Sequence, residues 1–240
     1  MSVTLTEAST ALHAQWSRLR TWVGEVVDDD VAAAPSVLDG WTVAELVAHL
    51  GRAMDALAFC TPSPAGTVPL SLAEYLGTYV ARATDIAETT RQLATEISGD
   101  PLRWVDARAA AAFAQLEELG PHDLVVEARR GPVLLSTMTA SRVIELVVHA
   151  DDLARSVRRA PGAGSGPDPL DPGALRLVAD TLLAIVVARG GWDLEVADER
   201  RWVRLAAGRT AYDVDELADA LHARYTSEGV PDLGRMLPVL

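Results

Sequence analysis

The residue types best suited to chemistry gather in one stretch of the chain, which runs from 142 to 156 and reads RVIELVVHADDLARS. Its apolar residues recur at helical spacing, and Glu145 and His149 stand four residues apart. In a helix this spacing places a carboxylate and an imidazole on the same face. Such a polar stripe is either the solvent face of an amphipathic helix or the lining of a wet cavity that holds a ligand.

A second histidine completes a possible ligand set. His49 lies in a segment with helical pattern from 43 to about 59, at the border of its apolar face. Two imidazoles and one carboxylate suit a divalent metal and leave positions open to water or substrate. Bundles build metal sites in this way, from side chains on facing helices. The competing interpretation is that Glu and His at this spacing lie on solvated faces, which is the commoner case for the pattern alone.

Three more residues are candidates for a supporting role. Asp152, three residues beyond His149, is placed to orient a histidine ligand, although a solvated aspartate is the commoner interpretation. Arg82 and Arg142 are each able to hold a substrate carboxylate in a bidentate ion pair. Surface arginines are common, however, and every basic residue of this chain is an arginine.

Composition excludes several classes of function. The 240 residues suffice for one large or two modest domains with a sizeable core. A net charge of -13 argues against nucleic-acid binding, and no apolar run approaches the roughly 20 residues of a membrane span. We see no signal peptide. The single cysteine, Cys60, excludes an internal disulfide framework and a Cys-rich zinc site, so a reducing cytoplasm fits best.

The elements that must position these residues are mostly helices. Apolar spacing predicts long helices over 4–27, 43–59, 72–97 and 140–157 and a shorter helix over 101–120. The segment within 124–136 is expected to form a short β-hairpin or an irregular excursion. Capping boxes mark three of the helix starts, with Thr42, Ser71 and, as a variant, Asp213 as the N-caps and a glutamate three residues beyond each. Four long antiparallel helices form a bundle by default.

The stretch 161–171, PGAGSGPDPLD, has the composition of a linker. It predicts a helical N-terminal domain over 1–160 and a small α+β C-terminal domain over 172–240. In the second domain we expect a helix over 172–189, a hairpin formed by WDLEV and WVRLA, and a last helix from 214 to about 225. The predicted fold class is therefore mainly α.

Two of these stretches resemble a known family. GWTVAELVAHL, which contains His49, resembles the second helix of the mycothiol-dependent maleylpyruvate isomerase family, one of the DinB-like metal-binding bundles. RVIELVVHADDLARS resembles the family's fourth helix. The resemblance covers about residues 1–160 and implies a DinB-like four-helix bundle. It also implies that His49, Glu145 and His149 are the metal ligands, with Asp152 at the family's trailing aspartate.

The resemblance further implies a type of chemistry. Family members of known activity use a divalent metal, typically zinc, to bind the thiol of mycothiol, the small thiol of GC-rich actinobacteria. A metal-bound thiol is deprotonated near neutral pH and becomes a nucleophile. In the isomerase it adds to the cis double bond of maleylpyruvate, and rotation and expulsion of the thiol yield the trans isomer. The resemblance implies that arginines bind the dicarboxylate, with Arg82 as the candidate.

Three functions stay open at this point. The chain is a maleylpyruvate isomerase-like enzyme, an S-transferase that passes mycothiol to an electrophilic metabolite, or a non-catalytic module that binds a metal or a small molecule. The expected partners are a small thiol and an electrophilic or dicarboxylate substrate, with neither nucleic acid nor membrane. We expect a monomer or a homodimer. Residues 172–240 resemble a shortened form of the family's sterol-carrier-like domain, and we assign no site residue to them.

Overall fold

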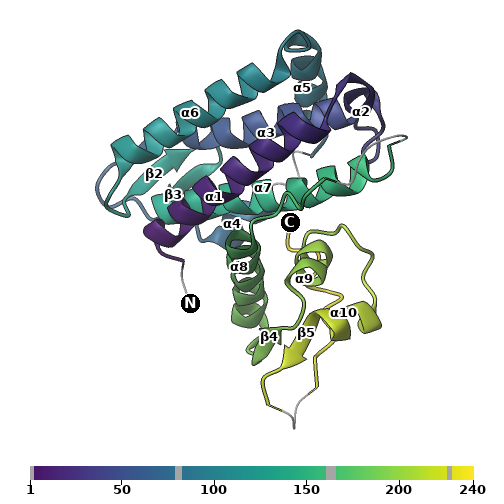
Figure 1. Ribbon diagram of the computed structural model, residues 1–240. Helices are drawn as coiled ribbons and strands as arrows, with labels where there is room; N and C mark the ends of the chain where they lie inside the picture. The colour runs from purple at the N-terminus through teal and green to yellow at the C-terminus, as the bar shows by residue number, and fades with distance from the viewer. Residues whose placement is uncertain (1–2, 79–82, 161–165, 226–228) are drawn as a thin grey trace.

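The computed structural model describes residues 3–78, 83–160, 166–225 and 229–240, which contain ten α-helices and five short β-strands. Figure 1 shows the long helices of the first part lying side by side. They are α1 (Leu5–Val26), α3 (Val43–Ala58), α6 (Pro101–Leu119) and α7 (Leu135–Val157), and the shorter ones are α2 (Asp29–Ala33), α4 (Leu72–Gly77) and α5 (Ala83–Glu96). The prediction of a mainly α fold that begins with a helical bundle is confirmed.

Local sequence explains where the bundle helices begin. The Thr42 hydroxyl accepts a hydrogen bond from the Glu45 backbone N–H at 3.2 Å, and the Glu45 carboxylate accepts one from the Thr42 N–H at 2.6 Å. Ser71 forms a second capping box at the start of α4, as predicted, and Thr4 forms a third, unpredicted one at the start of α1. Each box satisfies backbone donors that a helix N-terminus leaves unpaired. The α3 box fixes the start of the helix that carries His49.

α7 is the central helix of the molecule. It contacts α1, α3 and α8, and twenty of its side chains are buried. These include polar residues that a solvent-facing stripe would expose, such as Arg142 and Asp152. A helix that is enclosed on nearly all sides is a core helix rather than an amphipathic surface helix. The solvent-face interpretation of this stretch is therefore wrong.

Two features of the first part differ in extent from the prediction. Where one helix was expected over 72–97, the structure describes α4 and α5 as separate helices, and residues 79–82 between them lie outside the described part. The hairpin is confirmed as β2 (Val125–Ala128) and β3 (Gly131–Leu134), with Val126 opposite Val133. β1 (Thr61–Pro62) adds a third antiparallel strand. α7 begins directly after β3, earlier than predicted.

The prediction for the C-terminal part was wrong in one pairing. The segment WVRLA, expected to be a strand, lies in α9 (Glu199–Ala206), because Asp198 caps the helix and Trp202, Val203, Leu205 and Ala206 form a buried helical face. β4 (Leu194–Val196) pairs instead with β5 (Leu221–Ala223), antiparallel, with Glu195 opposite His222. The last predicted helix is correspondingly shorter. α8 (Pro172–Gly190) and α10 (Val214–Ala220) complete this part.

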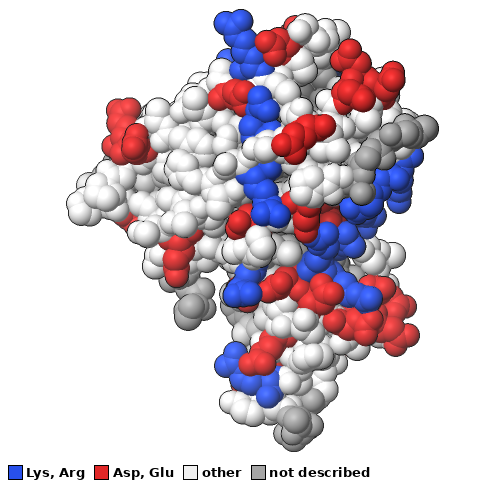
Figure 2. Space-filling view, viewed as in Figure 1, with Lys and Arg blue, Asp and Glu red and all other residues white. Residues whose placement is uncertain are grey.

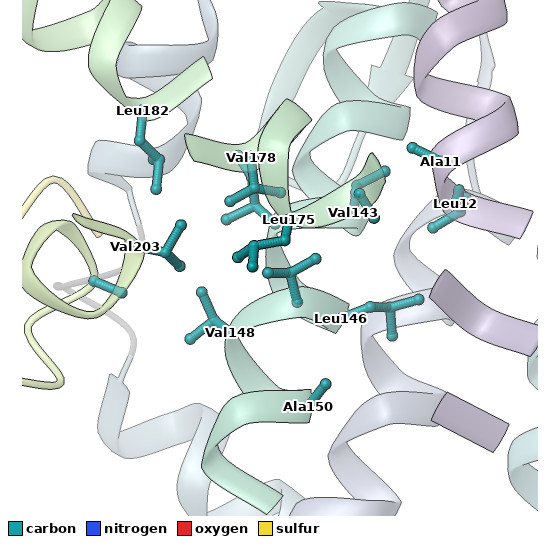
Figure 3. Close-up of a cluster of buried hydrophobic side chains, with 14 of the residues drawn as sticks. Ala11, Leu12, Val143, Leu146, Val148, Ala150, Leu175, Val178, Leu182 and Val203 are labelled. Carbon is teal, nitrogen blue, oxygen red and sulfur yellow. The ribbon is translucent and has the colours of Figure 1, made fainter. Parts of the chain in front are cut away.

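The two parts share one apolar core. Figure 3 shows side chains from α1, α7, α8 and α9 meeting in a single cluster, with Leu12, Leu146, Val178 and Val203 among them. The buried Gln15 side chain adds polar links, since it donates to the Pro169 carbonyl and accepts from the Asp171 N–H. The division into two domains at 161–171 stays a prediction. In the part of the chain that is described, no helix is both long and apolar enough to span a membrane.

Charged side chains of both signs lie close together on the face shown in Figure 2, along its centre and over the C-terminal part. The left side of this face, over α6 and β2, is largely uncharged. Ion pairs join different elements of the molecule, such as Arg20 of α1 with Asp106 of α6 and Arg204 of α9 with Asp151 of α7.

Candidate metal centre

The three predicted ligands meet where α3 packs against α7. One ligand atom from each of His49, Glu145 and His149 lies within 4.8 Å of the others. The Glu145 Oε2 atom is 3.5 Å from His49 Nε2 and 3.3 Å from His149 Nε2. The four-residue spacing of Glu145 and His149 places both on one face of α7, as predicted, and the α3–α7 contact supplies the third residue.

These separations fit a bound ion. Two ligands held about 2.1 Å from one zinc ion at a tetrahedral angle are about 3.4 Å apart. The two Nε2–Oε2 distances of 3.3 and 3.5 Å lie on either side of that value. They are also longer than a good N–H···O hydrogen bond, so the three groups do not satisfy one another well. Two imidazoles and a carboxylate are ligands that a divalent transition metal accepts.

His49 is prepared as a neutral ligand. Its ring forms T-shaped contacts with the ring of Trp41, at a centroid distance of 5.5 Å, and with the ring of His149, at 4.7 Å. Burial lowers the pKa of His49, which keeps a lone pair available on the ring at neutral pH. Its buried Nδ1 atom has no hydrogen-bond partner among the described residues. The side chains of His49, Glu145 and His149 remain 12, 12 and 9 % exposed, so the centre is not sealed from solvent.

Asp152 stands behind His149 on the side away from Glu145. Its Oδ2 atom is 3.1 Å from His149 Nδ1, and both of its oxygens accept from Arg209 Nε, at 3.1 and 3.0 Å. Asp152 is fully buried, so the interpretation of a solvated aspartate is wrong. With Nδ1–H donated to Asp152, the tautomer assigned from this network leaves the Nε2 lone pair facing Glu145.

The charges of the centre depend on one another. Burial raises the pKa of Glu145, but the two histidine rings and Arg142 outweigh it and hold this pKa well below its usual value. Burial lowers the pKa of His149, but hydrogen bonding to Asp152 and Glu145 outweighs it, so the net shift is upward. Burial raises the pKa of Asp152, but His149 and Arg209 lower it overall. Both carboxylates are therefore ionised at neutral pH.

Of the two candidate arginines, Arg142 lies in the part of the chain that the structure describes. Arg142 is only 3 % exposed, which overturns the surface interpretation. Its Nη1 donates to the Ala53 carbonyl at 3.0 Å, and its Nη2 lies 4.0 Å from Glu145 Oε1. Arg142 thus links α7 to α3 and places a positive charge beside the carboxylate of Glu145. Arg82 lies outside the described residues.

Cys60 is a core residue. It is fully buried, and burial raises the pKa of its thiol to about 11. A thiol with so high a pKa is almost wholly protonated at neutral pH and is a poor nucleophile.

Arg209 is the residue that sequence reasoning missed. It follows Gly208, whose φ of 66° makes the tight turn after α9, and its Nη1 donates to the Ala207 carbonyl at 3.0 Å. Its partner Asp152 is 57 positions away in the chain. No local pattern links two residues at that separation, so only the docking of α9 against α7 reveals the pair.

Comparisons with known proteins bear on the family and the fold of the chain. The model of the family described as "Mycothiol maleylpyruvate isomerase N-terminal domain" matches residues 12–154, more than half of the chain. None of the curated proteins matches the chain. A crystal structure of the mycothiol-dependent maleylpyruvate isomerase is 20 % identical, with a TM-score of 0.52 over 95 % of this chain and 93 % of that chain.

The crystal structure of a histidine-to-alanine mutant with the same enzyme description is 19 % identical, with the same TM-score and coverage. At these identities the likeness concerns the fold alone. Because it covers nearly the whole chain, it includes elements of the C-terminal part as well as the bundle.

Proposed function

Because the chain belongs to the mycothiol maleylpyruvate isomerase N-terminal domain family, we propose that it is a metal- and thiol-dependent enzyme. In this proposal His49, Glu145 and His149 hold one divalent ion, with zinc the expected metal. The observation that carries the proposal is the convergence of these three ligand atoms within 4.8 Å at the α3–α7 contact. Two neutral imidazoles and one carboxylate leave a bound dication with a net charge of about +1, which favours an anionic ligand such as a thiolate.

The roles of the chain's own groups follow from their positions. A divalent ion supplies one chemical effect, since it lowers the pKa of a coordinated thiol until the thiolate predominates near neutral pH. Glu145 and the two histidines hold the ion, and Arg142 places a positive charge beside Glu145. Asp152 orients His149. The small exposed fraction of the ligands limits the access of water to the reacting groups.

The proposed reaction is a cis–trans isomerisation that uses mycothiol as the thiol cosubstrate. The sulfur adds to one carbon of the cis double bond of a maleylpyruvate-like dicarboxylate, and a proton is taken up at the other. The resulting single bond rotates. Loss of that proton and expulsion of the thiol restore the double bond as trans, so the thiol is regenerated and no oxidant is needed. Arg82 is proposed to bind a substrate carboxylate. The proposed compartment is the reducing cytoplasm of an actinobacterium.

Two measurements test this proposal. Metal analysis of the purified protein is expected to find about one equivalent of zinc or another divalent ion, which is lost in His149→Ala. Turnover of maleylpyruvate is expected to need both mycothiol and the metal. A protein that binds no ion on titration, or turnover that needs no thiol, would contradict the proposal. Consumption of mycothiol by an electrophile, without isomerisation, identifies an S-transferase, and bound metal without any turnover identifies a binding module.

A further inference from the structure

Two adjacent aspartates of α7 are each held by an arginine from the C-terminal part. Arg204 donates from Nε and Nη2 to the two oxygens of Asp151, both at 2.7 Å. Arg209 donates from Nε to both oxygens of Asp152, at 3.1 and 3.0 Å. Both carboxylates are buried. The two pairs therefore look alike as links between α7 and the α9 region.

The two ion pairs differ in which other residues each aspartate contacts. Consecutive residues of a helix point about 100° apart, so Asp151 and Asp152 face different neighbours. Asp151 lies toward α9, with Arg200 as a more distant partner at 4.0 Å. Asp152 lies toward the metal centre, with His149 Nδ1 at 3.1 Å. Only the second pair forms a chain that ends on a proposed metal ligand.

We propose that Arg209 is a positioning residue of the metal centre, which holds Asp152 so that Asp152 in turn fixes the tautomer and orientation of His149. The C-terminal part, which contributes none of the three ligands, would thereby set how strongly α7 binds the ion. The inference rests on the proposed function, because it takes His149 to be a ligand.

The physical argument concerns a buried charge. A histidine that binds metal through Nε2 must carry its proton on Nδ1, and a carboxylate acceptor at Nδ1 fixes that state and strengthens the ligand. Asp152 has no exposed surface, so its charge depends on protein partners rather than on water. Arg209 supplies a permanent positive charge that is itself anchored by the turn at Gly208 and by its bond to the Ala207 carbonyl. Without it, Asp152 would lose its ionic partner while remaining buried.

The test compares Arg209→Gln with the matched control Arg204→Gln. Zinc affinity is measured by competition with a chelator, and the coordination sphere is observed through the visible spectrum of the cobalt(II)-loaded protein. We expect Arg209→Gln to weaken zinc binding by about tenfold or more and to change the cobalt spectrum, whereas Arg204→Gln stays within about twofold of the wild type. Arg209→Lys, which retains the charge, is expected to recover part of the loss.

A second readout needs no metal. In the metal-free wild type at alkaline pH, ¹⁵N chemical shifts of the neutral His149 ring are expected to place its proton on Nδ1, and in Arg209→Gln to show a mixture of tautomers. A wild-type protein that binds no zinc defeats the proposed function, while these shifts still test the role of Arg209. If zinc affinity and the ¹⁵N chemical shifts of His149 were unchanged in Arg209→Gln, the inference would be overturned. An equal loss of zinc affinity in Arg204→Gln would also overturn it, because that result would indicate a general loosening of α9.

Discussion

Glu145 is the residue on which the metal centre most depends. Its Oε2 atom is the common neighbour of both histidine nitrogens, and Arg142 lies beside its other oxygen. It is also the only one of the three proposed ligands that brings a negative charge. The attraction between Glu145 and a dication is strong because the carboxylate is largely removed from water.

Glu145→Gln is therefore expected to weaken zinc binding by at least about 100-fold, more than the loss of an outer partner usually costs. The variant keeps the shape of the side chain but removes its charge. Chelator competition measures the effect, with circular dichroism to confirm folding. The control is Glu118→Gln, on the exposed face of α6, which should bind zinc as the wild type does. If the wild type, Glu145→Gln and Glu118→Gln bound zinc with equal affinity, Glu145 would not be a metal ligand.

The raised pKa of His149 determines how the stability of the folded protein and its affinity for zinc change with pH. A group whose pKa is higher in the folded state contributes stability that is fully present below the unfolded-state value, here 6.5, and is lost as the pH rises through the folded value. Zinc and a proton compete for the same nitrogen of the His149 ring. The affinity of the protein for zinc therefore rises as the pH is raised through the folded-state pKa of His149.

The rise in Tm on adding zinc is accordingly expected to grow as the pH is raised from below 6.5 through the folded pKa of His149. Thermal unfolding with and without zinc at a series of pH values measures it. In Asp152→Asn the acceptor charge that raises this pKa is gone, so the same growth should occur at lower pH. A zinc effect that is constant over the series would contradict the assignment.

At the scale of elements, the site depends on how closely α3 approaches α6. Gly51 lies two positions from His49, and a Cβ atom there would come within 2.3 Å of the Trp104 ring. Glycine at this position thus lets α3 and α6 pack closely, whereas the side chain of any other residue would push the two helices apart. Since His49 is carried by the same turn of α3, this contact also sets the position of one proposed ligand.

Gly51→Ala is expected to lower the free energy of unfolding by about 1–2 kcal/mol, because the overpacking at Trp104 exceeds the gain in helix propensity. Urea unfolding of the metal-free protein measures it. The matched control is Gly77→Ala in α4, where nothing lies within 4 Å of the added methyl group and the change should be neutral or slightly stabilising. Equal stability of the Gly51 variant and the wild type would show that the helices relax without cost.

At the scale of the whole molecule, the bundle and the C-terminal part are joined by a common core. Leu146 of α7, Val178 of α8 and Val203 of α9 belong to one buried cluster (Figure 3). The ion pair between Arg204 and Asp151 lies at the same contact. Removing the C-terminal part would expose this apolar surface, so the two parts are expected to stabilise each other.

We therefore expect urea to unfold the whole chain in one transition. Far-ultraviolet circular dichroism reports the helices, and tryptophan fluorescence includes the fully buried Trp202 of α9, so the two curves should coincide. Zinc should shift both curves by the same amount although its proposed ligands lie only in the bundle. Two separate transitions, with zinc acting on one alone, would instead support independent domains divided at 161–171.

The sequence by itself determined the elements that carry the proposed ligands. Helix α3 could be located from its capping box, and α7 from its apolar spacing, because both signals act over one or two turns of backbone. The separation of Glu145 from His149 likewise placed them on one helical face. The contact with His49, by contrast, has no local signal: residue types offered His49 only as a possible third ligand, and the family resemblance favoured it over the solvated interpretation.

Tertiary structure alone decided what surrounds those ligands. The burial of Arg142 and Asp152 depends on neighbours from other helices, so their polar character misleads when each is considered alone. WVRLA was assigned to a strand although its apolar positions also fit a helix, and β4 finds its partner in β5. The partnership of Arg209 with Asp152 arises only when α9 docks on α7. Local spacing is set by backbone geometry, whereas contacts between distant residues are set by how the elements pack.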